Sequence, residues 1–262
     1  MSIRKQLNLP KEHGAWAMLY VPFVLGVLVA SRLNLPVALL LVTVTALFIS
    51  RESLLIWWRA RQRGRSAPAA ARLLLIYFAV ACACGLTLLF GYRLWWLAPL
   101  GLFGLGLLTI NGKQGAQLVD RSWQSEMLAI IGLTLTAPAA YYAASGLWNA
   151  QAIWLWVLAA VYFISSVFHI KYRVAALHPS RQAAAQVAER HCLTYHSFLL
   201  SALLLLWLTG SLPVFALIAF APAIARAFWN LFKPAQPINL TRAGVFEIVY
   251  SLVFLVFIAL AF

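Results

Sequence analysis

The stretch Phe48–Arg72 carries the densest group of cations in the chain, with a single acid among them. The cations are Arg51, Arg59, Arg61, Arg63, Arg65 and Arg72, and the acid is Glu52. Arg51, Leu55 and Arg59 follow one another at four-residue intervals, which places them on one face of a helix. An Arg or a Glu at the inner end of a membrane helix needs a partner or a ligand. We therefore place Arg51, Glu52 and Arg59 among the candidate ligand contacts, whereas the cations after them are typical of a flank that fixes topology.

Three ionisable side chains in a row open the first apolar segment and form a second candidate site. These residues are Lys11, Glu12 and His13, and Gly14 follows them. Glu12 suits the positive N-terminus of a helix, and Gly14 allows a neighbour or a ligand to approach the backbone closely. An ordinary interfacial helix cap explains the same residues, so the sequence leaves both interpretations open.

A polar segment between two later apolar runs supplies a third group of candidates. It consists of Asn111–Gly115 followed by Asp120–Glu126, and Asp120, Arg121 and Glu126 are its candidate binding residues. The Asn and Gly residues favour a turn, and the polar side chains are suited to line a cleft. The segment is not a phosphate-binding P-loop, because the spacing GxxxxGK[ST] is absent.

Ionisable residues also occur near the ends of the later apolar runs. Ser165, His169 and Arg173 repeat the four-residue spacing. A His one helical turn from an Arg is suited to bind an anion or to act as an acid or base, so His169 and Arg173 join the candidate binding residues. A solvated helix end accounts for them equally well. In the last run, Glu247 is expected to pair with an arginine from another helix, for which Arg226 is a candidate.

Neither a catalytic triad nor a set of metal ligands is evident, so the catalytic residues stay unknown. The six acids show no DxxxD or DDxxD spacing, which makes a carboxylate cage for Mg2+ doubtful, and no other cofactor is evident. Cys82 and Cys84 lie in an apolar run with too few neighbouring ligands for zinc. We interpret them, with Cys192, as packing residues.

The elements that position all these residues must be membrane helices. Of the 262 residues, 64% are hydrophobic and only 10% are charged, whereas a soluble domain carries about 25% charged residues. The apolar runs have the length of bilayer-spanning helices, and their continuity excludes the alternation of a β-barrel. The sequence predicts an all-α polytopic membrane bundle with one domain over residues 1–262. The net charge of +14 then reflects orientation in the lipid bilayer rather than nucleic-acid binding.

Nine spans are predicted, and the seventh and eighth depend on one turn. The spans cover about Gly14–Ala30, Leu35–Trp57, Leu73–Phe90, Trp95–Ile110, Met127–Ala144, Ala152–Ile170, two segments within Ser197–Trp229, and Val245–Phe262. A single helix over Ser197–Trp229 would be about 50 Å long, which exceeds a hydrocarbon core of about 30 Å. The Gly and Pro within Thr209–Pro213 therefore favour a turn between two short spans.

The distribution of charge predicts an orientation. With nine spans and the N-terminus inside, 18 of the 20 Lys and Arg fall on the cytoplasmic side, and the exceptions are Arg32 and Arg93. This asymmetry predicts an N-in, C-out multi-pass protein. The inner-face loops then cover about residues 58–72, 111–126, 171–196 and 230–244, and polar chemistry is expected at that face.

Several of these segments resemble a known family. Pro10-Lys-Glu-His-Gly-Ala-Trp-Ala-Met-Leu-Tyr-Val-Pro22 resembles the opening signature of the YwiC-like family of bacterial membrane proteins. Arg51-Glu-Ser53 and Asp120–Glu126 fit the same likeness, which extends over most of the chain. The resemblance implies a location in the bacterial cytoplasmic membrane but no reaction, because the family's biochemical role is not established.

A more distant resemblance is to the UbiA superfamily of intramembrane prenyltransferases, through the nine spans and the polar inner face. Those enzymes carry Asp-rich motifs at the inner ends of the second and sixth helices, and the carboxylates hold magnesium ions that bridge to a prenyl diphosphate. The corresponding places here hold Arg51, Glu52 and Arg59, and Ser165, His169 and Arg173. The resemblance implies a fold and a site location, while the cations suit direct contact with a phosphate or carboxylate.

Three functions remain open at the level of sequence. The favoured one is binding of an anionic isoprenoid or lipid-like ligand at the inner face, with or without a UbiA-like transfer reaction. The second is a carrier for a small anion, which ionisable residues and prolines inside apolar spans favour. The third is a non-catalytic membrane scaffold.

Overall fold

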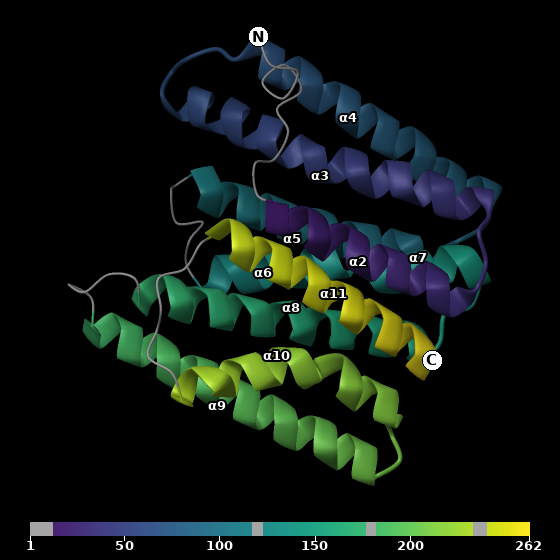
Figure 1. The fold of residues 1–262 in the computed structure, drawn as a ribbon. Coiled ribbons are helices and arrows are strands. Elements are labelled where there is room, and N and C mark those ends of the chain that lie inside the picture. The colour runs from purple at the N-terminus through teal and green to yellow at the C-terminus, as the bar shows by residue number, and fades with distance from the viewer. Residues whose placement is uncertain (1–12, 117–122, 177–181, 233–239) are drawn as a thin grey trace. The chain divides into compact units, whose positions relative to one another are not determined.

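A computed structural model describes residues 13–116, 123–176, 182–232 and 240–262, all in helices or the turns between them. The first helices are α2 (His13–Ala30), α3 (Leu35–Gln62), α4 (Pro68–Leu86), the π-helix η1 (Thr87–Gly91), α5 (Leu97–Ala116), α6 (Trp123–Thr134) and α7 (Thr136–Ser145). The later helices are α8 (Ala150–Ala176), α9 (Gln182–Leu208), α10 (Val214–Phe232) and α11 (Leu240–Ala261). The all-α prediction is therefore confirmed (Figure 1).

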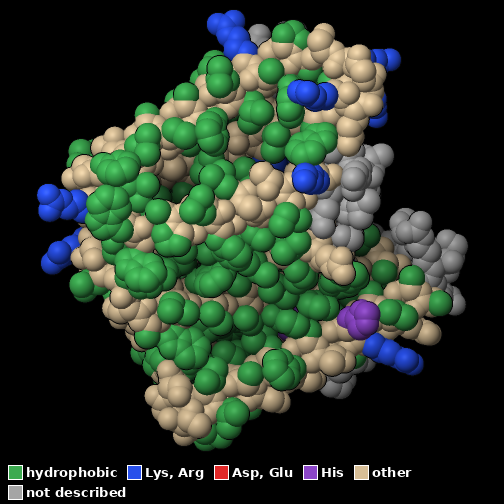
Figure 2. Space-filling view, turned by 180° about the vertical axis from the view of Figure 1, so that it is seen from behind, with side chains coloured by type: hydrophobic (Ala, Val, Ile, Leu, Met, Phe, Trp, Pro, Cys, Tyr) green, Lys and Arg blue, Asp and Glu red, His purple; other side chains and the backbone are tan. Residues whose placement is uncertain are grey.

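The described helices have the length and composition of membrane spans. Six helical segments there are long and apolar enough to cross a bilayer: Leu35–Gln62, Pro68–Gly91, Trp123–Ser145, Ala150–Ala176, Ala183–Leu208 and Gly244–Ala261. Three shorter apolar helices accompany them: Gly14–Ala30, Leu97–Lys113 and Val214–Trp229. Hydrophobic side chains cover most of the surface that Figure 2 displays. A bilayer can shield such a surface from water, so the protein is a membrane protein.

The break between the two doubtful spans lies where the sequence predicts it. Helix α9 ends at Leu208, α10 begins at Val214, and Gly210 between them has a φ of 72°. Glycine adopts this left-handed conformation without the steric cost that a Cβ atom brings. The prediction of two helices separated by Thr209–Pro213 is confirmed.

The connections predicted as long inner loops are largely helical. Helix α8 continues to Ala176 and α9 begins at Gln182, so most of residues 171–196 is helix rather than loop. The run Gln182–Ala188 is rich in alanine, the residue that favours a helix most. Likewise α3 continues to Gln62, and α5 extends through the turn expected at residues 111–115. A polar segment marks the end of a membrane span, but the helix can continue through it. The sequence-based prediction took the end of each apolar run as the end of the helix.

The chain divides into two compact units, Met1–Trp156 and Val157–Phe262, each of which is described by itself. In the first unit, α2 packs closely on α7. All residues from Thr136 to Ala144 on α7 are buried, and many of them are alanines. Small side chains let two membrane helices approach closely. The single membrane domain over residues 1–262 stays a prediction.

Polar side chains also join the helices of the first unit. The Asn34 side chain accepts a hydrogen bond from Val37 N (3.0 Å) and thereby caps α3. Its amide nitrogen also donates to the carbonyl oxygens of Ala143 (3.3 Å) and Ala144 (3.0 Å) near the end of α7. At the start of α7, the Thr136 hydroxyl donates to the Leu19 carbonyl oxygen at 2.8 Å. These bonds fix α7 against α2 and α3.

The second unit consists of most of α8 with α9, α10 and α11, and its core is aromatic. Tyr162 on α8 stacks on Phe254 of α11 with ring centroids 4.2 Å apart, and Phe220 of α10 contacts both rings edge-on. The three side chains are fully buried. Tyr195 on α9 stacks on Phe168 of α8 and donates its hydroxyl to the Val161 carbonyl oxygen at 2.8 Å. The four helices therefore share one core.

Candidate functional site

In the first unit, a short chain of hydrogen bonds holds Arg51 in place. Arg51 Nε on α3 donates to Asn111 Oδ1 on α5 at 3.1 Å. The Asn111 amide nitrogen donates to the carbonyl oxygen (2.9 Å) and the hydroxyl (3.2 Å) of Ser125 on α6. Asn111 and Ser125 are 5% and 1% exposed, so water competes little for these bonds. We call these three residues the Arg51 network.

The Arg51 network leaves the end of the guanidinium available. Among the described residues, Nε is the Arg51 atom that forms a hydrogen bond, and the two Nη groups form none. Because the guanidinium is planar, a bond that fixes Nε also fixes the direction of the two Nη groups. Paired Nη donors match the two oxygens of a carboxylate or a phosphate. The geometry of Arg51 suits an oxyanion that approaches from outside the network.

Tryptophans and further cations lie on the same part of α3. The Arg61 guanidinium lies over the Trp57 ring at 5.4 Å, and the Lys113 amine of α5 lies over the Trp58 ring at 5.9 Å. Tryptophan is enriched where a membrane helix meets the lipid headgroups. The side chains around Arg51 therefore combine positive charge with the amphipathic rings typical of the membrane surface.

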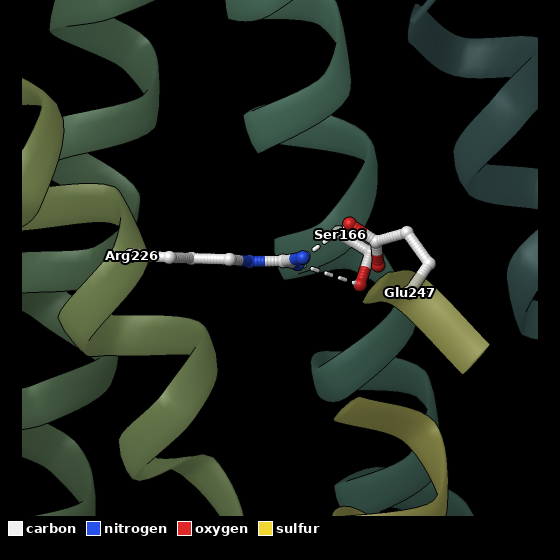
Figure 3. A network of polar contacts seen from close by, with 3 residues as sticks. All are labelled: Ser166, Arg226 and Glu247. Carbon is white, nitrogen blue, oxygen red and sulfur yellow. Dashed lines mark hydrogen bonds and ion pairs between the residues drawn. The ribbon is translucent and has the colours of Figure 1, made fainter. Parts of the chain in front are cut away.

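In the second unit, Arg226 is the centre of another polar group. Arg226 Nη1 on α10 forms an ion pair with Glu247 Oε1 on α11, and Nη2 donates to Ser166 Oγ on α8 at 3.1 Å (Figure 3). The side chains of Arg226 and Glu247 are only 10% and 20% exposed. The expectation that Glu247 pairs with an arginine from another helix is confirmed. We call Ser166, Arg226 and Glu247 the Arg226 network.

Two histidines belong to the surroundings of the Arg226 network. Arg226 interacts electrostatically with His169 on α8 and His196 on α9. His196 is fully buried, and its Nδ1 lies 2.7 Å from the Cys192 carbonyl oxygen. A carbonyl oxygen only accepts, so Nδ1 carries the proton and Nε2 has the lone pair when the ring is neutral. Within the described ranges, His196 Nε2, His169 Nδ1 and Ser165 Oγ are buried without a hydrogen-bond partner.

The candidate residues from the sequence fall into three groups. Arg51, Glu52 and Arg59 lie on α3 and Glu126 on α6, so these four belong to the first unit. His169 and Arg173 lie on α8 within the second unit. Lys11, Glu12, Asp120 and Arg121 lie outside the described residues, and His13 begins α2 without a described side chain. The role of each as a binding residue stays a prediction.

Sequence reasoning left several polar residues of these networks out of the site. Arg226 and Glu247 could be recognised from the sequence as candidate partners, because a charge inside an apolar run needs a partner. Asn111 was assigned to a turn, and Ser125 and Ser166 gave no signal, since neutral polar side chains are common in membrane helices. Only the structure shows that Asn111 binds Arg51 and that Ser166 binds Arg226, while Ser125 accepts from Asn111.

The described part of the chain contains no group of three or more His, Cys, Asp or Glu side chains suited to hold a metal ion. The Arg51 network presents guanidinium and amide donors, which match anions rather than cations. The expectation that magnesium binding is doubtful stays a prediction.

Part of the chain, including the Arg51 network, matches a known protein family. A search of the curated proteins and a search of the solved structures each found no match, so the UbiA resemblance has no support from a solved fold. The sequence pattern of a family described as YwiC-like protein matches residues 9–141. That match covers α2 to α6 and most of α7, and therefore the whole Arg51 network. Because the matched residues are half of the chain, this membrane protein belongs to the YwiC-like family.

Proposed function

We propose that this YwiC-like membrane protein binds an anionic isoprenoid or a similar lipid through Arg51. The observation that carries the proposal is the guanidinium of Arg51, whose Nε is fixed by Asn111 while both Nη groups form no hydrogen bond to any other described residue. A side chain held in advance loses little conformational freedom on binding, which favours affinity. The ligand headgroup is a phosphate or a carboxylate, because these oxyanions accept two parallel hydrogen bonds from one arginine.

The surroundings of Arg51 support a ligand with an apolar tail. Arg59 and Arg61 follow Arg51 on α3, and Trp57 and Trp58 lie between them. The cations suit the headgroup, and the tryptophans suit its boundary with the hydrocarbon. Exposed apolar side chains on α3 and α4, such as Ile56 and Leu75, offer contacts to a tail. The tail then stays in the bilayer while the headgroup meets Arg51.

The proposal includes an orientation in the bacterial cytoplasmic membrane. With the N-terminus inside, the Arg51 end of α3 faces the cytoplasm, because 18 of the 20 Lys and Arg lie on that side. The nine continuous helical segments among the described residues support this alternation. The C-terminal end of α11 then faces outward.

A transfer reaction of the UbiA kind is the finer form of this proposal. It rests on the position of Arg51, Glu52 and Arg59, which corresponds to that of the first UbiA Asp-rich motif. These residues offer one carboxylate beside two guanidiniums. A diphosphate held here would have its charge neutralised by arginine instead of magnesium. Binding alone and binding with transfer are separated by whether the bound lipid is chemically altered.

The direct test measures retention and affinity of a lipid phosphate. The first measurement is native mass spectrometry of the protein purified in mild detergent, which identifies lipids that stay bound. Farnesyl monophosphate then serves as the probe in a titration of the wild type, Arg51→Lys and Arg51→Gln. Lysine keeps the charge without the fork, so we expect Arg51→Lys to weaken binding about tenfold, which is about 1.4 kcal/mol.

Arg65→Gln is the matched control for this titration. Arg65 is exposed in the turn between α3 and α4, so its loss removes the same charge without touching the Arg51 network. We expect the control to bind the probe within about twofold of the wild type, since exposed charge pairs are weak. Equal affinity of the wild type and both Arg51 variants would refute binding at this site.

A further inference from the structure

The Arg226 network places two opposite charges in the core of the second unit. Arg226 lies within the apolar stretch Val214–Trp229, and Glu247 lies within Gly244–Ala261. Charges in such surroundings are stable only as a pair, because neither has water to solvate it. Any event that neutralises Glu247 therefore removes the carboxylate charge that pairs with Arg226 Nη1.

The groups that face this pair come from every helix of the unit. Helix α8 contributes Tyr162, Ser166 and His169, α9 contributes Cys192 and His196, and α11 contributes Tyr250 beside Glu247. Arg173 on α8 acts on His169, and Glu189 on α9 acts on Cys192. Glu247 is the acid that bonds directly to Arg226. It is therefore the group whose protonation releases the guanidinium.

We propose that the Arg226 network is a proton-linked site for a monovalent oxyanion, such as a carboxylate or a phosphate ester. In the structure, Glu247 occupies the anion position on Arg226. In the other state, a proton from water binds a carboxylate oxygen of Glu247, and the neutral acid releases Nη1 of Arg226. An external oxyanion then takes the vacated position. One proton and one negative charge enter together, so the net charge of the core is unchanged.

The neighbouring polar atoms fit an anion that enters with bound water. Ser166 accepts from Arg226 Nη2 at 3.1 Å, and its own hydroxyl hydrogen is available as a second donor. Ser165 Oγ, His169 Nδ1 and His196 Nε2 are among the buried polar atoms of this unit that lack a hydrogen-bond partner within the described ranges. Buried polar atoms cost free energy when they stay unpaired. Water that enters with a polar ligand would give these atoms hydrogen-bond partners. The ion pair of Arg226 with Glu247 alone does not.

This site is built from different residues than the one proposed at Arg51. It uses residues 166–247, all beyond the stretch 9–141 that matches the family, and its ligand is defined by charge rather than by a lipid tail. An oxyanion of this class can come from solution or from a phosphodiester headgroup. The two sources are distinguished by the probes of the experiment.

The experiment measures proton uptake on anion binding to the full-length protein in detergent. Formate is the soluble probe, because it remains a monovalent anion above about pH 5. Titration calorimetry in two buffers with different ionisation enthalpies gives the number of protons bound per formate. We expect one proton per formate and an affinity that falls about tenfold for each pH unit once Glu247 is ionised.

Two variants at the pair give opposite results. Glu247→Gln imitates the protonated acid, so we expect it to bind formate with no proton uptake and no pH dependence. Arg226→Gln removes the anion partner, so we expect no binding. Glu189→Gln, which lies on α9 outside the network, should keep the affinity, the proton uptake and the pH dependence of the wild type. Because Glu247→Gln gains a positive signal, the test does not depend on how well Arg226→Gln folds.

The lipid source is examined in nanodiscs that contain phosphatidylglycerol. Native mass spectrometry should show more retained phosphatidylglycerol at low pH and in Glu247→Gln when the headgroup is the occupant. Formate binding without such retention assigns the site to a soluble anion. Formate that binds without proton uptake overturns the proposal, as does a Glu247→Gln variant that keeps the pH dependence. Absence of Arg226-dependent binding for both probes overturns it as well.

Discussion

Arg51 and Arg226 show two ways in which a membrane protein holds an arginine. Arg51 is fixed at Nε by a neutral amide, and its terminal nitrogens form no hydrogen bond within the part of the chain that the structure describes. Arg226 uses its terminal nitrogens on Glu247 and Ser166. The first arrangement is the one proposed above to bind an anion, whereas in the second the carboxylate of Glu247 already pairs with the arginine. The sequence alone could not separate these two cases, because the partner of each arginine lies on a different helix.

A glycine gives the sharpest prediction for a single residue. A Cβ atom at Gly26 would lie 2.2 Å from the Ala137 carbonyl oxygen and 2.8 Å from Tyr141 N, both in the backbone of α7. Gly26→Ala must therefore push α2 away from α7. We expect it to lower the free energy of unfolding by roughly 1–3 kcal/mol, measured as a lower melting temperature in detergent.

Gly106→Ala is the control for this substitution. A Cβ atom at Gly106 on α5 would meet nothing within 4 Å, so the helix-favouring alanine should leave the protein as stable or slightly more stable. A Gly26→Ala variant that melts with the control would contradict the close packing of α2 on α7.

Proline and threonine shape the elements of the first unit. Pro138 cannot donate a backbone hydrogen bond, and the helix is interrupted between Thr134 and Thr136 just before it. At this interruption, the Thr136 hydroxyl lies within hydrogen-bond distance of the Leu133 carbonyl oxygen of its own segment and of the Leu19 carbonyl oxygen of α2. The second bond joins α7 to α2.

Substitutions at Asn34 test how much its hydrogen bonds stabilise the junction between α3 and α7. Asn34→Ala removes both the cap of α3 and the bonds to the end of α7, whereas Asn34→Ser keeps a capping oxygen and loses only the bonds to α7. Loss of a cap costs about 1 kcal/mol. We therefore expect the stability order wild type, Asn34→Ser, Asn34→Ala in thermal unfolding. Equal melting temperatures for the three proteins would show that the junction contributes nothing.

The existence of the helices was easier to predict from the sequence than their exact ends or the residues with which they form hydrogen bonds. The break at Thr209–Pro213 followed from the length of the apolar run and from a glycine and a proline. The start of α9 at Gln182 was missed, because a polar, alanine-rich segment resembles a loop by hydropathy while it favours a helix by propensity. Asn111 was missed as a partner of Arg51, since hydrogen bonding across 60 residues of sequence leaves no local pattern.

At the scale of the whole molecule, the distribution of charge predicts the orientation of the helices in the membrane. In the proposed orientation, Arg51 and Asn111 lie toward the cytoplasmic ends of α3 and α5. Arg226 and Glu247 likewise lie nearer the cytoplasmic ends of α10 and α11. For each network taken by itself, this orientation predicts that its ligand approaches from the cytoplasm or the inner leaflet.

Cysteine labelling tests this orientation. On a background without Cys82, Cys84 and Cys192, Arg32→Cys should react with a membrane-impermeant maleimide in intact cells. Arg65→Cys should react only after the cells are permeabilised, because it lies on the side rich in cations. Both positions are exposed, so burial does not explain a difference between them. The reverse pattern would invert the topology and place both networks on the outer side.

The apolar part of α10 is short, so the thickness of the bilayer is expected to affect this protein. Val214–Trp229 spans only about 24 Å at 1.5 Å per residue, less than the ~30 Å of an average hydrocarbon core. Lipids thin locally around a segment that is too short for them. Water and headgroups are thereby drawn toward Arg226, which lies three residues from the end of this stretch. If Glu247 takes up a proton as proposed, we expect its access to protons to depend on the thickness of the surrounding bilayer.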